Sequence, residues 1–285
     1  MKYRELYLTG VKKLEEAGIG EASLDARLLL EYVCDTDRNT LLVHPDMEVS
    51  DEKEKCYVNY INKREERMPL QHITGNQCFM GLGFYVNQDV LIPRQDTEVL
   101  VEEVMPHVHD GMSILDVCTG SGCILISLLQ YSNDCKGVGI DLSSNALAVA
   151  KKNAENILSE KNLCVDFYQG DLFESLSECE DKFDIIVSNP PYIPTAVIDE
   201  LEPEVKLHDP MMALDGKEDG LYFYRKIVAE AGKYLTRGGK LFFEIGYDQG
   251  EAVSNLLKDA GYTDIEIKQD YAGLDRVVFG TFLED

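Results

Sequence analysis

The chain has 285 residues, 45% hydrophobic and 28% charged, a composition typical of an ordinary globular protein large enough for two domains. The formal net charge of −25 disfavours a duplex-DNA partner, because phosphate contacts need a basic surface. No apolar run is long enough to span a bilayer, and the charged N-terminal segment lacks the apolar core of a signal peptide. We therefore expect a cytoplasmic monomer that binds neither membrane nor nucleic acid directly.

The eight cysteines include no CxxC pair, so the sequence predicts reduced thiols and no metal site. His107 and His109 lack a surrounding pattern of Cys, Asp or Glu ligands and are expected to lie on the surface.

Residues 1–75 predict a small helical bundle, because their apolar residues recur at helical spacing. Helices are expected over 3–18, over 21–34 and from the caps Ser50 and Asp51 through Met68. The stripes expected to face the core are Leu6, Val11 and Leu14, then Leu24, Leu28 and Leu29, then Tyr57, Val58 and Ile61. The bundle has either a substrate-recognition role or a packing role, and helix propensity does not separate the two.

Residues 76–95 predict a linking β-hairpin, since 76–92 are rich in Phe, Tyr, Val and Gly. From residue 96 to 285 the pattern is typical of an α/β domain with a mostly parallel seven-stranded sheet and helices on both faces. The last two strands have no helix between them, so one of them is expected to run antiparallel. The predicted strands are 113–117, 136–140, 165–169, 183–188, 240–245, 263–269 and 275–281.

A glycine-containing turn, DVCTGSG at 116–122, follows the first of these strands, and Asp141 ends the second. Glycines at such a turn let the backbone approach a nucleotide-type ligand, and a carboxylate at the next strand end can hold ribose hydroxyls. A nicotinamide dinucleotide site is the alternative, but the third fingerprint glycine is replaced by Leu125. With Asp116 available for a cationic amino group, the set fits S-adenosylmethionine. Asp171 follows the third strand and is expected to accept from the adenine amino group while Leu172 or Phe173 packs against the ring, although Asp171 could instead cap a helix.

The fourth strand ends in Asn189-Pro190-Pro191-Tyr192, the sharpest signal in the chain. Consecutive prolines fix the backbone and offer carbonyl acceptors without competing N–H donors. The Asn189 side-chain oxygen and the Pro190 carbonyl would accept hydrogen bonds from an NH2 group, and Tyr192 would stack on a planar amide or base. The segment therefore predicts methyl transfer to an amide or amino nitrogen, the alternative being a rigid strand-end turn.

This tetrapeptide resembles that of the amino-methyltransferases with the class I, Rossmann-like fold. Within them the chain is similar to the peptide chain release factor N5-glutamine methyltransferases (the PrmC, or HemK, family). The resemblance covers nearly the whole chain, including RMPLQHITGNQCFMGLGFYV at 67–86, LIPRQDTEVL at 91–100, DVCTGSGCI at 116–124, IVSNPPYI at 186–193, DGLYFYRKI at 219–227, GGKLFFEIG at 238–246 and DYAGLDRVV at 270–278.

The resemblance implies a protein substrate, the glutamine of the Gly-Gly-Gln motif of class I release factors, bound by Asn189, Pro190, Pro191 and Tyr192, with Asn189, Pro190 and Tyr192 in the catalytic role. It also implies that Arg94, Thr97 and Glu98 lie near the cofactor. The chain departs from many relatives at Gln95, Cys118 and Leu172, where they carry Pro, Gly and Trp. Residues expected to bind S-adenosylmethionine are Asp116, Cys118, Thr119, Gly120, Ser121, Gly122, Asp141, Asp171, Leu172 and Asn189.

Two other functions stay open from the sequence. A nucleic-acid adenine or guanine amino-methyltransferase would use the same tetrapeptide, although the acidic net charge counts against it. A non-catalytic module that binds release factors is the other, and the presence of Asp141 and Asn189 counts against that.

Overall fold

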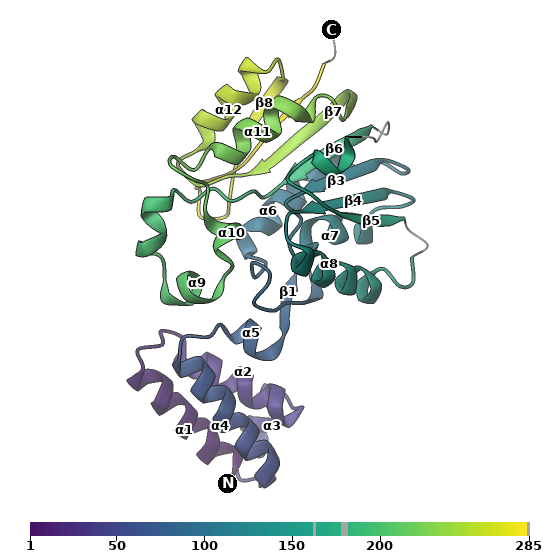
Figure 1. Ribbon diagram of the computed structural model, residues 1–285. Coiled ribbons are helices and arrows are strands. Elements are labelled where there is room, and N and C mark those ends of the chain that lie inside the picture. The colour runs from purple at the N-terminus through teal and green to yellow at the C-terminus, as the bar shows by residue number, and fades with distance from the viewer. Residues whose placement is uncertain (162–163, 178–181, 284–285) are drawn as a thin grey trace. The chain divides into compact units, whose positions relative to one another are not determined.

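The computed structural model describes residues 1–161, 164–177 and 182–283. The chain forms two compact units (Figure 1). One comprises Met1–Asn76 together with Glu202–His208, and the other comprises Gln77–Leu201 together with Asp209–Asp285.

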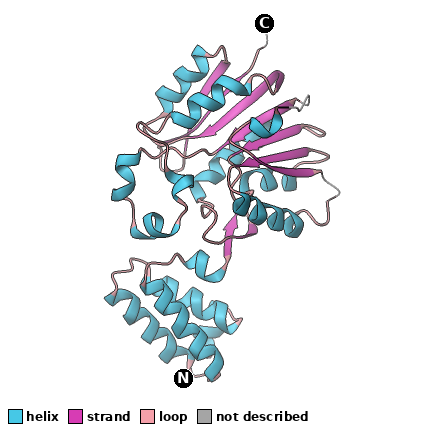
Figure 2. Ribbon diagram, viewed as in Figure 1, coloured by secondary structure: helices cyan, strands magenta, loops and turns pink. Residues whose placement is uncertain are grey.

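The first unit is entirely helical and has its own apolar core (Figure 2). Ser50 caps α4 as expected, its hydroxyl accepting from the Lys53 N–H at 3.4 Å. The short helices α3 and α5 were not predicted. The unit contains α1 (Tyr3–Glu16), α2 (Ala22–Cys34), α3 (Arg38–Val43), α4 (Asp51–Glu65), α5 (Leu70–Thr74) and α9 (Pro203–His208).

Two of the predicted core stripes need correction. Leu24 on α2 is 40% exposed and Val58 on α4 is 43% exposed. Leu24 is two positions from the buried residues Ala22 and Ala26, and positions two apart lie on nearly opposite sides of a helix. Leu24 therefore points away from the face that α2 buries. That face consists of Ala22, Ala26, Leu29 and Leu30 together with Asp25.

Helix α9 comes from far along the chain but belongs to the helical unit. Its Glu204 forms ion pairs with Arg64 at 3.1 Å and with Arg67 at 3.4 Å. Arg64 is buried and also pairs with Asp25 at 2.7 Å, so one guanidinium joins two acidic groups that are far apart in the sequence. The domain boundary drawn from the sequence at residue 75 does not include this segment.

The second unit begins with a hairpin of β1 (Asn76–Phe79) and β2 (Leu82–Tyr85), followed by a seven-stranded sheet of order β5-β4-β3-β6-β7-β9-β8. In the seven-stranded sheet β9 runs antiparallel to both β7 and β8, and the other described strand pairs are parallel. The predicted α/β fold class is confirmed. The strands are β3 (Ser113–Val117), β4 (Lys136–Asp141), β5 (Val165–Gln169), β6 (Phe183–Ser188), β7 (Leu235–Glu244), β8 (Thr263–Gln269) and β9 (Asp275–Thr281).

Helices cover both faces of the sheet because successive apolar residues of the central strands point to opposite sides. Ile114 of β3 packs with α6 (Gln95–Val104), α7 (Cys123–Tyr131) and α8 (Ser144–Ile157), whereas Leu115 packs with α11 (Tyr222–Ala231) and α12 (Gly250–Asp259). The remaining short helices are η1 (Met105–His107), η2 (Glu174–Leu176), η3 (Thr195–Glu200) and α10 (Met211–Leu214).

Within the described part of the chain, no helix has the length and apolar character that a membrane span requires. The seven described cysteines are free thiols, and Cys179 lies outside the described residues.

Candidate active site

A pocket lies where the order of the parallel strands reverses. From β3 the chain proceeds outward to β4 and β5, then returns to the other side of β3 with β6. In open α/β sheets this reversal leaves a crevice at the carboxyl ends of the strands, where ligands bind. The glycine turn follows β3 and the Asn-Pro-Pro-Tyr segment follows β6, so strand order brings together two motifs that are about 70 residues apart.

The glycine turn is fixed by the end of the neighbouring strand. Asp141 at the end of β4 accepts hydrogen bonds from the Gly120 N–H at 2.8 Å and the Ser143 N–H at 2.9 Å. Gly122 has φ +78°, and a Cβ there would lie 2.7 Å from the Ile126 side chain, so both conformation and space require glycine. The conformation of the turn therefore depends on the Asp141 carboxylate and on glycine at position 122.

Asp116 lies beneath this turn and is fully buried. Its Oδ2 accepts a hydrogen bond from the Thr119 hydroxyl at 2.7 Å, while its Oδ1 has no hydrogen-bond partner among the described residues. Burial raises the pKa of Asp116 to about 7, and the bond from Thr119 acts in the opposite direction. The free oxygen suits a cationic or hydrogen-bonding group placed against the turn.

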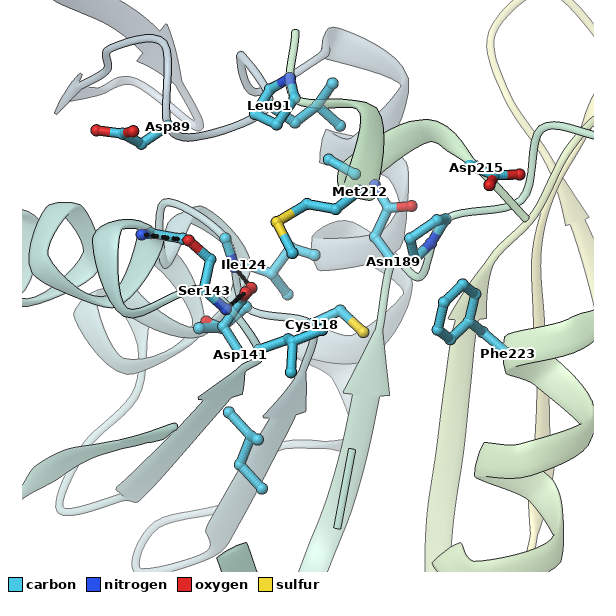
Figure 3. Close-up of a pocket in the computed structure, with 18 of the residues that line it drawn as sticks. Asp89, Leu91, Cys118, Ile124, Asp141, Ser143, Asn189, Met212, Asp215 and Phe223 are labelled. Carbon is cyan, nitrogen blue, oxygen red and sulfur yellow. Dashed lines mark hydrogen bonds between the residues drawn. The ribbon is translucent and has the colours of Figure 1, made fainter. Parts of the chain in front are cut away.

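The pocket has a volume of about 470 Å³, within the range of small-molecule sites. In Figure 3, Asp141, Cys118 and Asn189 lie near the strand ends, and Met212 reaches into the same space from α10. The predicted site residues that line it are Cys118, Thr119, Gly120, Asp141, Asp171, Leu172, Asn189 and Pro191. The predicted site residues outside its lining are Asp116, Ser121, Gly122, Pro190 and Tyr192.

Sequence reasoning missed several lining residues. Met211 and Met212 lie after the tetrapeptide in a region without a recognised motif, and Phe223 lies in the segment DGLYFYRKI, to which no site role was assigned; only the fold brings the three to the pocket. Leu142 and Ser143 directly follow Asp141 and could have been expected from that position alone.

The resemblance implies that Arg94, Thr97 and Glu98 lie near the cofactor, but only the first two line the pocket. Arg94 and Thr97 line the pocket, and Arg94 forms an ion pair with the buried Asp209 at 2.6 Å. Glu98 instead accepts a hydrogen bond from the Met80 N–H at 2.6 Å and so anchors the turn of the β1–β2 hairpin.

The Asn-Pro-Pro-Tyr segment is held by hydrogen bonds at both ends. The Asn189 Nδ2 donates to the Thr97 hydroxyl at 3.4 Å. The Tyr192 hydroxyl donates to Glu244 Oε1 at 3.3 Å, and the Tyr192 carbonyl accepts from Gln249 Nε2 at 3.0 Å. The half-buried Tyr192 ring is thus oriented by residues of β7 and of the turn before α12.

The segment 214–220 packs against the end of the tetrapeptide through an isolated parallel bridge between Ile193 and Asp215. The Ile193 N–H donates to the Leu214 carbonyl at 3.0 Å, and the Gly216 N–H donates to the Ile193 carbonyl at 2.8 Å. Gly220 has φ +73°, and a Cβ there would lie 2.3 Å from the Tyr192 carbonyl oxygen. The close approach therefore depends on glycine.

Glu244 was not predicted as part of the site. It is 2% exposed at the end of β7, and burial raises its pKa to about 7, while Thr97, Arg276 and Tyr192 act in the opposite direction. The available signal was an acidic residue at the end of the apolar run KLFFEI. Only the fold shows that this strand lies beside the one that carries the tetrapeptide.

Comparison with known proteins identifies the family. A model of the PrmC N-terminal domain matches residues 5–75, and a methyltransferase domain model matches residues 108–262. A release factor glutamine methyltransferase of Caulobacter vibrioides is 44% identical, covering 94% of this chain and 92% of the relative. That of Clostridium acetobutylicum is 40% identical, covering 98% of each chain.

The chain belongs to the release factor glutamine methyltransferase family. Among solved structures, a methyltransferase from Pyrococcus furiosus is 15% identical and covers 82% of this chain and 100% of its own, with a TM-score of 0.53, a similarity of fold. The predicted family and enzyme class are thereby confirmed, and with them S-adenosylmethionine as the methyl donor.

Proposed function

We propose that the chain transfers a methyl group from S-adenosylmethionine to the side-chain nitrogen of the glutamine in the Gly-Gly-Gln motif of class I peptide chain release factors. The observation that carries this proposal is the placement of Asn189 beside the glycine turn, at the ends of the adjacent strands β6 and β3. The relatives that bear the release factor name match over nearly their whole length, including the helical unit. The reaction belongs to the cytoplasm, where release factors act.

The residues present fit this cofactor. Each carboxylate oxygen can accept more than one hydrogen bond, so Asp141 can still hold ribose hydroxyls while it binds the Gly120 and Ser143 N–H groups. Leu172 and Asp171 would contact the adenine ring and its amino group from the end of β5. Cys118, Thr119 and Gly120 would line the methionine part, with Ser121 and Gly122 shaping the turn and the free oxygen of Asp116 near the amino group.

S-adenosylmethionine supplies an electrophilic methyl group on a sulfonium sulfur. The task of the chain is to present a poorly nucleophilic amide nitrogen, whose lone pair is delocalised into the carbonyl. Asn189 Oδ1 and the Pro190 carbonyl would accept the two N–H bonds and turn the lone pair toward the methyl group, while Tyr192 would pack on the amide plane. Methyl transfer would form the nitrogen–carbon bond, leave the sulfur with the electron pair of the broken sulfur–carbon bond and release one proton from the amide nitrogen. Positioning and a fixed field of acceptors supply the rate gain.

The helical unit is proposed to recognise the release factor, and the enzyme is proposed to act as a monomer on that protein without contacting nucleic acid. The sequence boundaries 1–75, 76–95 and 96–285 are proposed as functional parts, with the segment 202–208 added to the first.

Mass spectrometry of the substrate tests the proposal. The protein is incubated with S-adenosylmethionine and an unmethylated release factor, and the digested peptide containing Gly-Gly-Gln is fragmented. A gain of one methyl group on that glutamine is expected, and a release factor with Gln→Ala in the motif is the control. No gain, with the cofactor shown to bind by calorimetry, would contradict it and lead to a screen of RNA and DNA for methylated adenine or guanine.

A further inference from the structure

Helix α8 contacts two walls of the pocket. One wall is the glycine turn, which packs so closely on the helix that a Cβ on Gly122 would lie 3.2 Å from the Ala150 Cβ. The other wall is the segment that follows β2, whose residues Asp89 and Leu91 lie across the pocket from Asp141 (Figure 3). An apolar cluster attaches this segment to α8, and its buried members are Val86, Val90, Ala146 and Val149.

Asn153 of the same helix is hydrogen-bonded to both walls. It is 1% exposed and lies outside the lining of the pocket. Its Nδ2 donates to the Ser121 carbonyl of the glycine turn at 2.9 Å and to the Tyr85 carbonyl at the end of β2 at 3.0 Å. Its Oδ1 accepts from the Tyr85 N–H at 2.8 Å. One side-chain amide therefore joins two segments that are 36 residues apart in the sequence.

The arrangement requires an amide. The three bonds use both hydrogens of the Asn153 nitrogen and also its oxygen. An aspartate of the same size could still accept from the Tyr85 N–H, but its carboxylate would face the Ser121 and Tyr85 carbonyls with no proton to donate. Because unpaired buried acceptors cost free energy, the site favours asparagine over its acidic isostere.

The bond to Ser121 completes the support of the glycine turn. The Asp141 carboxylate holds the Gly120 N–H at 2.8 Å, and Asn153 holds the carbonyl of the next residue. Ser121 is itself buried. Loss of the Asn153 donor would leave its carbonyl without this partner, and movement of the turn would relieve that cost.

We propose that Asn153 is a positioning residue for the cofactor, because by joining Ser121 to Tyr85 it fixes the glycine turn relative to the segment 85–91 and so preorganises the pocket for S-adenosylmethionine. A preorganised pocket binds more tightly because less conformational freedom is lost when the ligand enters. The inference rests on the proposed placement of S-adenosylmethionine in this pocket, but not on the identity of the methyl acceptor.

Calorimetry of S-adenosylmethionine binding gives the first test. We expect the Kd to rise about tenfold in Asn153→Asp, which loses both donated bonds, and at least as much in Asn153→Ala, which loses all three. Glu155→Gln, an exposed change on the same helix, should bind as the unchanged protein does. A Kd in both Asn153 variants within about twofold of the unchanged protein would overturn the proposal.

A variant on α12 separates positioning from a general loss of stability. Val253→Ala trims a fully buried side chain in the apolar cluster on the other face of the sheet, so it should lower the melting temperature. We expect its Kd for S-adenosylmethionine to stay within about twofold of the unchanged value. A rise in Kd as large as that of Asn153→Ala would show that lost stability alone weakens binding, against the positioning role.

Amide hydrogen exchange followed by NMR needs no cofactor. In Asn153→Asp the Tyr85 N–H should stay protected, because the carboxylate still accepts from it, whereas the Gly120 N–H should exchange faster as the turn loosens. In Asn153→Ala both should exchange faster. Unchanged exchange of the Gly120 N–H in both variants would refute the support of the turn.

The unchanged protein supplies a further measurement that holds even if neither variant folds. Both side-chain NH2 protons of Asn153 should be protected from exchange in the absence of cofactor, because each is donated to a carbonyl. Free exchange of these protons would overturn the proposal.

Asp141→Ala shows which inference has failed if binding is not as expected. Weaker binding in Asp141→Ala with normal binding in both Asn153 variants would leave the cofactor placement intact and exclude the positioning role. Normal binding in all three variants would instead exclude the placement of S-adenosylmethionine in this pocket, and the role of Asn153 with it.

Discussion

The carboxylate of Asp141 accepts the Gly120 N–H at 2.8 Å and thereby joins the end of β4 to the glycine turn after β3. One side chain thus shapes the turn and faces the pocket, so a change at Asp141 affects both the cofactor site and the turn that surrounds it.

We expect Asp141→Ala to weaken S-adenosylmethionine binding by about 1–3 kcal/mol, the cost of losing hydrogen bonds to a charged group. Isothermal titration calorimetry measures this directly. Asp166→Asn on β5 removes a carboxylate on an exposed residue and should bind normally. Unchanged affinity in Asp141→Ala would remove this residue from the ribose site.

Asn189→Ala removes the proposed acceptor for the substrate amide. We expect kcat to fall about 100-fold or more, as for the loss of a preorganised group in other active sites, while most cofactor affinity is kept. Methyl transfer to the release factor and calorimetry give the two readouts. Asn156→Ala, an exposed change on α8, is the control. Activity equal to that of the control would exclude the acceptor role.

The buried Glu244 should make the second unit less stable as the pH rises. Its pKa is raised from 4.5 to about 7, so the folded state binds the proton more tightly than the unfolded chain. The stability from this group is full below about pH 4.5 and is lost as the pH rises through about 7. Urea unfolding at pH 4.5 and 8 should show a difference from this group of roughly 3 kcal/mol, absent in Glu244→Gln and kept in Glu155→Gln. An identical pH dependence in all three proteins would contradict this assignment.

The ionised carboxylate of Glu244 accepts a hydrogen bond from the Tyr192 hydroxyl. Ionisation of Glu244 should therefore raise activity, although it lowers stability. With Arg276 and Asp96 as the nearest charged groups, we expect kcat to increase with pH through about 7 and this rise to be missing in Glu244→Gln. A pH–rate profile measured at saturating substrate distinguishes the two cases.

Cys118 adopts a left-handed backbone, with φ +64°, in the turn that follows β3. Comparing Cys118→Gly with Cys118→Ala isolates this effect, because both remove the thiol. The glycine variant should be more stable by about 1 kcal/mol, since alanine is strained in this region. At Cys56, inside α4, the order should reverse because a helix interior favours alanine. Thermal unfolding of the four variants measures their relative stability. If alanine were the more stable substitution at both positions, backbone strain at Cys118 would be contradicted.

Much of the fold could be predicted because the central strands of the sheet are short apolar runs closed by turns, as FDIIVS before Asn189 illustrates. The site was predictable wherever the functional residue ends a strand, as Asp141 does, or directly follows one, as Asn189 does. Glu244 also ends a strand, but its role depends on which strands are neighbours, and strand order is not contained in local patterns. Leu24 was misplaced because an apolar residue on a helix can face solvent without a local signal.

The ion pairs of Glu204 have a consequence for folding during synthesis. Glu204 lies 140 residues after its partner Arg64, whereas Asp25, the other partner, precedes Arg64. At about 5–20 residues per second, the ribosome needs roughly 7–28 s to add this stretch. The helical unit can therefore form most of its core early, but it is completed only after most of the sheet has been synthesised. The first part of the chain to emerge is among the last to receive all its contacts.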